Sequence, residues 1–314
     1  MPVGEARPHG LPVMNGFAAW IMRGPMYASA LATVALLLGA ALPPFAWLSA
    51  AILALVILAT GSGGLARVAL PGVVVATVAA WLVTGSPWLV FALALVSWGP
   101  ALVVAGTLRA TVRLDLALFA AALMGWIVVL GIQLAAADMA ALWQDVLARM
   151  MPPEALGREL DVEPAALEQV YARVAPLMTG LVAASLVLSG ITATLLARWW
   201  QATLYNPGGF RAEFHGLRLG QTAALVTVGL MAAAAFTESA LLFAVAVVPA
   251  TVFLIQGLAV VHGVVAVRGL QVGWLVGLYV LGVVLFLQVA MILVVVGMAD
   301  AWVDLRGRAA GRSE

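Results

Sequence analysis

Lysine and cysteine are both missing from this chain of 314 residues, and charged residues make up only 9% of it. Without lysine the chain has no Walker-type phosphate loop and no amine for Schiff-base chemistry. Without cysteine it has no disulfides, thiolate nucleophiles or iron–sulfur clusters. The net charge of +1 provides no field that would attract nucleic acid. These absences exclude several classes of enzyme and argue against a nucleic-acid partner.

Patterns typical of catalytic and metal sites are also missing. His9, His215 and His262 lie far apart and do not have metal-ligand spacing. No serine or threonine stands in a nucleophile-elbow motif. The long apolar runs contain no paired carboxylates. The sequence therefore predicts no catalytic residue, no metal and no cofactor, and we expect that the protein is not an enzyme.

What the chain does have is apolar length, because 65% of its residues are hydrophobic. Runs of about 20 apolar residues can cross a bilayer as helix, and they lack the alternation of barrel strands. We therefore expect an all-α, polytopic transmembrane helical bundle of eight to nine spans, with residues 1–314 forming a single integral membrane domain. The expected spans are 27–42, 43–60, 68–84, 88–108, 114–137, 174–197, 218–236, 239–267 and 272–298.

The first apolar run begins at Tyr27, behind a long polar lead. Because the leading region of a signal peptide is usually short, we expect an uncleaved first helix rather than a signal cleaved after Ala41. Pro43 and Pro44 then predict a tight hairpin between the first two spans.

Arginines predict the orientation, because positively charged loops stay in the cytoplasm. The opposite short connections contain no arginine, so the N-terminus is expected to be cytoplasmic. Nine spans would place the C-terminal Arg306 and Arg308 outside, whereas loss of one span would change the side, and the sequence leaves this open. The arginines of the expected cytoplasmic side are Arg23, Arg67, Arg109, Arg113, Arg198, Arg211, Arg218 and Arg268.

Residues 138–173 form the one sizeable segment outside the expected spans, and they are rich in aspartate and glutamate. Apolar residues recur there at helical spacing, and Glu163-Pro164 is typical of a helix start. We expect two amphipathic extracytoplasmic helices joined by residues 151–153. Their acidic faces are interpreted either as solvated surface or as a surface that recruits a partner.

Four polar residues interrupt the apolar runs, and polar groups at membrane depth usually face the bundle interior. They predict either interhelical hydrogen bonds or a ligand pocket. These candidate pocket residues are Gln133, Gln256, His262 and Gln288.

Gly269, Gly273 and Gly277 are spaced four apart at the start of the last expected span. Glycines at this spacing share a helix face and allow a neighbouring backbone to approach closely. We expect them to promote packing within the chain rather than a dimer interface. The oligomeric state itself is not predicted.

Polar and aromatic residues gather between two expected spans, at 198–218, where they predict a cytoplasmic interfacial loop. Asn206 to Gly209 read as a turn, and Phe210 and Phe214 share one face of a short amphipathic helix. The loop is interpreted either as an interfacial re-entry or as a docking surface for a protein partner. Its candidate docking residues are Arg198, Trp199, Trp200, Tyr205, Asn206, Pro207, Gly208, Gly209, Phe210, Arg211, Glu213 and Phe214.

This loop, RWWQATLYNPGGFRAEFHGLRL, resembles the central motif of the YybS-like family, bacterial inner-membrane proteins described as a domain of unknown function. Residues 19–24 (AWIMRG) and 300–306 (DAWVDLR) resemble the flanking motifs. The resemblance implies a multi-pass fold related to the substrate-binding subunits of energy-coupling-factor vitamin transporters, with the scaffold protein MreD in the same broad grouping. It transfers no catalytic residue.

Residues and resemblance together favour a non-catalytic inner-membrane protein that binds a small hydrophobic or amphiphilic molecule, as a transport subunit. A cell-envelope scaffold, acting through the loop and the acidic segment, is the alternative. A membrane lipid-modifying enzyme is the third hypothesis.

Overall fold

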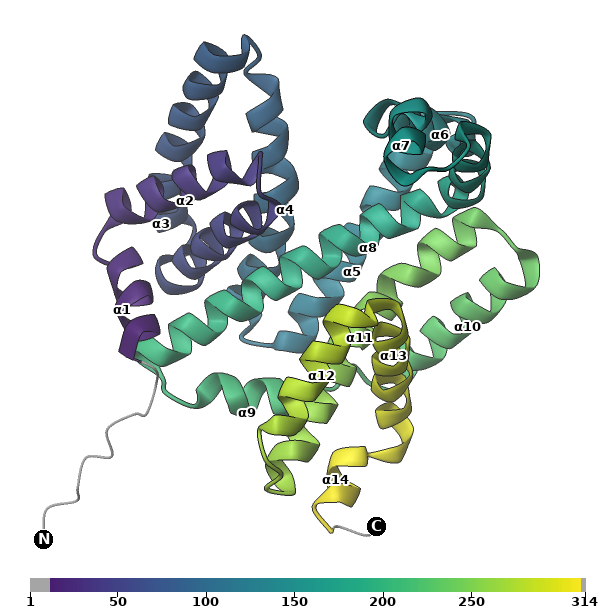
Figure 1. Cartoon of the computed structure of the whole chain (residues 1–314). Coiled ribbons are helices and arrows are strands. Elements are labelled where there is room, and N and C mark those ends of the chain that lie inside the picture. Colours follow the sequence, from purple (N-terminus) through teal and green to yellow (C-terminus); the bar gives the residue numbers. More distant parts are fainter. Residues whose placement is uncertain (1–11, 312–314) are drawn as a thin grey trace, which may run out of the picture.

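The computed structural model describes residues 12–311, and all regular structure in that range is helical (Figure 1). Helical structure follows from long apolar runs, since every backbone group must find a partner inside the bilayer. The all-α prediction is confirmed. The helices are α1 (Pro12–Ile21), α2 (Pro25–Gly39), α3 (Pro43–Thr84), α4 (Trp88–Thr111), α5 (Leu114–Gln133), α6 (Met139–Met150), α7 (Pro153–Leu160), α8 (Pro164–Tyr205), α9 (Gly209–His215), α10 (Gln221–Thr237), α11 (Ala240–Val267), α12 (Gly273–Val284), α13 (Phe286–Val303) and α14 (Leu305–Ala309).

Within the described range, six helices are long and apolar enough to cross a membrane: α3, α4, α5, α8, α11 and α13. Three further apolar helices, α2, α10 and α12, are shorter. The chain is therefore a multi-pass membrane protein. The expected count of eight to nine spans included these short helices, and it stays a prediction.

Two expected spans, 43–60 and 68–84, are the halves of one broken helix, α3. The break lies at Gly61, whose φ of 79° and ψ of −169° leave the helical region. Gln201 on α8 donates a hydrogen bond of 3.0 Å from Nε2 to the Leu58 carbonyl, and Arg109 on α4 donates to the same oxygen. Side chains from two other helices thus satisfy a carbonyl near the break.

The expectation of one continuous helix over 272–298 is wrong. The chain leaves the helical conformation at Leu285 (φ −123°, ψ 50°) and folds back, so that α12 and α13 form a hairpin (Figure 1). In α14, which follows α13, Arg306 donates a 2.6 Å hydrogen bond to the carbonyl of His215. The hairpin therefore brings the C-terminal arginines to the arginine-rich end of the bundle.

The glycines that meet a neighbouring backbone are not the expected ones. A Cβ added at Gly257 would lie 1.9 Å from the carbonyl oxygen of Leu293, and one at Gly297 would lie 2.2 Å from that of Phe253. This is where α11 and α13 cross. By contrast, Gly273 and Gly277 have nothing within 4 Å of such a Cβ, so the expectation of close packing there is wrong.

Helix α8 runs diagonally through the molecule and contacts α3, α4, α5, α6 and α11 (Figure 1). Its middle is buried: Val187 and Ile191 are fully enclosed. Its N-terminal part carries the segment that was expected to lie outside the membrane. Trp143 of α6 donates a 2.8 Å hydrogen bond from Nε1 to the Thr179 hydroxyl, and Tyr171 donates one of 2.8 Å to the Met151 carbonyl.

The 138–173 segment is helical, as predicted, but it is divided differently. The predicted helix start at Pro164 is the first residue of α8 itself, and α7 was not foreseen. Helices α6 and α7 lie at the end of the molecule opposite to α9 and α14 (Figure 1).

Candidate functional site

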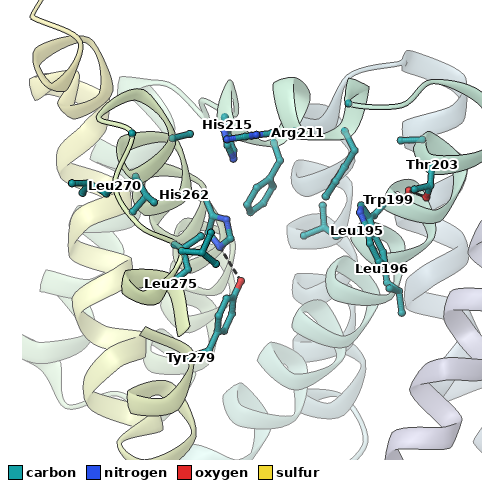
Figure 2. A pocket seen from close by; sticks show the side chains of 18 residues that line it. Leu195, Leu196, Trp199, Thr203, Arg211, His215, His262, Leu270, Leu275 and Tyr279 are labelled. Atoms are coloured by element: carbon teal, nitrogen blue, oxygen red, sulfur yellow. Dashed lines mark hydrogen bonds between the residues drawn. The ribbon is translucent and has the colours of Figure 1, made fainter. Parts of the chain in front are cut away.

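A pocket of about 700 Å³ opens between the last turns of α8, the short helix α9, the end of α11 and the start of α12 (Figure 2). It lies at the end of the bundle that carries the 198–218 loop. Most of its lining is apolar or aromatic, from Leu195 and Trp199 on one side to Leu275 on the other. Concave, largely apolar sites with a few polar groups are typical of small-molecule binding.

The polar centre of the pocket is a histidine–tyrosine pair. Nε2 of His262, on α11, lies 2.9 Å from the hydroxyl of Tyr279, on α12 (Figure 2). The edge of the Phe214 ring meets His262 at a centroid distance of 5.8 Å, and the His215 ring lies 6.2 Å away. Three elements thus bring aromatic and imidazole groups to one wall.

Helix α9 also forms the rim of the pocket. It begins after Gly208, whose φ of 86° suits glycine, and its Phe210 and Phe214 rings stack at 5.7 Å. The predicted short amphipathic helix is therefore confirmed. Its apolar face is turned into the protein, since Phe214 is buried and both rings line the pocket.

Arg211 and His215 give the rim its charge and hydrogen-bonding groups. Arg211 is exposed, and it makes no ion pair within residues 12–311. Burial is the main cause that lowers the pKa of His215, and the nearby charges of Arg211, His262 and Arg306 lower it further. The lowered pKa favours the neutral form of His215, and Arg211 provides a cation at the mouth.

Ion pairs fasten the loop around this pocket. Arg198 on α8 and Glu213 on α9 lie 2.9 Å apart, both largely buried. Arg218 pairs with Asp304, which follows α13. The buried Arg306 lies 2.6 Å from the buried carboxylate of Asp300. The Arg218–Asp304 pair, together with the hydrogen bond from Arg306 to the His215 carbonyl, joins the loop to the C-terminal segment.

Many residues of the predicted docking loop consequently make contacts within the protein. Trp200 is 2% exposed and meets Phe17 edge-on at 5.6 Å, while Trp199 lines the pocket. Tyr205 is 62% exposed, and the following turn 206–208 is also exposed. Of the predicted docking residues, Tyr205, this turn and Arg211 are the exposed ones.

Of the four predicted pocket residues, only His262 lines this pocket. Gln256 is fully buried elsewhere; its Oε1 accepts a 2.7 Å hydrogen bond from the Leu219 N–H, and its Nε2 donates one of 2.8 Å to the Gly297 carbonyl. Gln133 ends α5, and Gln288 is exposed in the first turn of α13. The structure does not bring the four side chains together.

The chief residue that sequence reasoning missed is Tyr279. Its signal is a tyrosine seventeen positions after His262 inside an apolar run. The spacing indicates a contact with His262 only if the chain is known to reverse direction between α11 and α12. The described helices also hold no group of three or more histidine, aspartate or glutamate side chains that could bind a metal.

No protein-family model matches the chain, and neither a curated protein nor a solved structure matches it.

Proposed function

We propose that the protein is a non-catalytic inner-membrane module that binds a small amphiphile with an anionic head. The observation that carries this proposal is the combination, in one pocket, of an aromatic and aliphatic lining with the His262–Tyr279 pair and with Arg211, which has no ion-pair partner in the part of the chain that the structure describes. The apolar lining would bind the hydrophobic part of the ligand, because binding removes both apolar surfaces from water. Arg211 and the neutral His215 would take its head by charge-assisted and ordinary hydrogen bonds.

The surroundings of the pocket support a role as a subunit that passes its ligand on. The exposed turn at 206–208 adjoins the mouth, since Gly208 itself lines the pocket. A protein partner that docked on this turn would lie against the opening. We therefore extend the proposal to a transport subunit whose cytoplasmic partner contacts Tyr205 and the turn.

The envelope scaffold is the second candidate, and one feature favours it. Helices α6 and α7 fold back onto α8 through the hydrogen bonds of Trp143 and Tyr171, which leaves their acidic faces exposed at the opposite end. A scaffold would use this surface and would need no occupied pocket.

Titration of the purified protein with dodecanoate and with uncharged dodecanol tests the proposed function. Wild-type protein should bind dodecanoate more tightly than dodecanol. In Arg211→Gln this preference should fall about tenfold, because the substitution removes a cation at the mouth that has no ion-pair partner within residues 12–311. Arg67→Gln is the matched control, because Arg67 is an exposed arginine outside this pocket. If the wild-type protein binds neither ligand, or if both variants lose the preference equally, the proposal fails.

A further inference from the structure

A second pocket, of about 480 Å³, lies on another face of the end of α8. Trp199, Ala202 and Thr203 face the first pocket, whereas Arg198, Gln201 and Tyr205 line the second. Residues spaced three and four apart share a helix face, so α8 separates two distinct cavities. The other walls come from the break in α3 and the end of α4.

Among residues 12–311, no carboxylate pairs with the guanidinium of Arg109 in the second pocket. Glu213 lines it too, but Glu213 is paired with Arg198 at 2.9 Å. Arg109 makes no ion pair with any residue between 12 and 311. Its neighbour Arg113 is paired with Asp115. The lining therefore carries a net charge of about +1, centred on Arg109.

The hydrogen bond that Arg109 makes beside the break in α3 uses only part of its donor capacity. One of its N–H groups donates to the Leu58 carbonyl, to which Gln201 already donates at 3.0 Å. A guanidinium has five N–H donors in a planar fork that matches paired oxygen atoms. Arg109 is itself exposed, and it lines this pocket together with the exposed residues Tyr205 and Asn206.

We propose that this second pocket binds the phosphodiester head of an amphiphile, with Arg109 as its anchoring cation. A phosphodiester carries one negative charge, which balances the net charge of the lining. A phosphomonoester would leave an excess of negative charge. Basic pockets between transmembrane helices are suited to lipid headgroups. Leu108 and the exposed Val112 provide an apolar side for the attached chains. The site is independent of the ligand proposed for the first pocket.

Two substitutions at Val112 test this site while avoiding damage to the fold. Val112 is 82% exposed and has a φ of 53°, a conformation that aspartate and asparagine adopt more readily than valine. Val112→Asp places a negative charge in the pocket, and Val112→Asn is its neutral counterpart of equal size. Native mass spectrometry with added phosphatidylglycerol measures the occupancy of each variant.

Val112→Asp should bind phosphatidylglycerol at least about tenfold more weakly than Val112→Asn, because the new carboxylate repels the phosphate. Arg109→Gln should weaken binding similarly, and Arg268→Gln, an exposed arginine outside the second pocket, should not. The same measurement with glycerophosphoglycerol, the deacylated headgroup, shows whether the ligand needs its acyl chains. Binding of the lipid alone supports an amphiphile, whereas equal binding of both would show that the chains contribute nothing and would overturn the amphiphile.

Equal occupancy in the two Val112 variants would overturn the second site, as would equal losses in Arg109→Gln and Arg268→Gln. Dodecanoate binding in the first pocket is measured in the same samples. Its persistence in Val112→Asp distinguishes failure of the second site from failure of the proposed function.

Discussion

At the scale of single residues, Gln256 joins three segments that are far apart in the sequence. It bridges the Leu219 N–H, which lies before α10, and the Gly297 carbonyl on α13. Gln256→Leu keeps the volume but leaves a buried N–H without a partner. The expected cost is about 1–3 kcal/mol of unfolding free energy, measured by denaturation in detergent micelles.

Gln288→Leu is the matched control for that measurement. Gln288 is exposed and makes no side-chain hydrogen bond within the described chain, so its replacement should change stability by no more than about 0.5 kcal/mol. Equal losses in the two variants would show that the Gln256 bridge contributes nothing specific.

The two glutamines also show how far single residues can be interpreted from sequence. Both interrupt apolar runs, and both were expected to face the interior. One does, whereas the other lies beside a reversal of the chain that exposes it. The difference depends on the turn at Leu285, where Leu-Phe continues the apolar pattern without proline or glycine. Nothing local marks that turn.

At the scale of elements, the crossing of α11 and α13 depends on glycines that leave no room for a side chain. Gly257→Ala would place a methyl group against the Leu293 carbonyl and force the helices apart. We expect a loss of about 1–3 kcal/mol in unfolding free energy.

Gly229→Ala provides the comparison, because a Cβ at Gly229 in α10 meets nothing within 4 Å. Alanine should there be neutral or stabilise the helix by up to about 1 kcal/mol. If Gly257→Ala is as stable as Gly229→Ala, the close crossing described above does not exist in solution.

Elements were predictable where local chemistry marks them. Pro43-Pro44 predicted the hairpin of α2 and α3, and Glu163-Pro164 predicted the first residue of α8. The phenylalanines of α9 predicted its helix but not what its apolar face contacts. Phe214 contacts His262 of α11, which lies 48 positions later in the chain, and no periodicity within α9 predicts that contact.

At the scale of the whole molecule, the α12–α13 hairpin places the C-terminal arginines beside the 198–218 loop. The natural absence of cysteine makes this testable with single cysteines and a membrane-impermeant maleimide. Pro207→Cys and Ala310→Cys should react from one side of the membrane, and Glu159→Cys on α7 from the other; all three positions are exposed. Labelling of Ala310→Cys together with Glu159→Cys would contradict the hairpin.

The central claim is that the pocket between α8, α9, α11 and α12 holds an amphiphile, and ligand retention tests it most directly. Ala266 lines the pocket, so Ala266→Trp should fill it, whereas Ala232→Trp adds the same side chain to an exposed face of α10. The measurement is the amphiphile that each variant retains through purification, quantified by native mass spectrometry. We predict retention in the wild type and in Ala232→Trp, and its loss in Ala266→Trp. Equal retention in both variants, or no ligand in the wild type, would contradict the account.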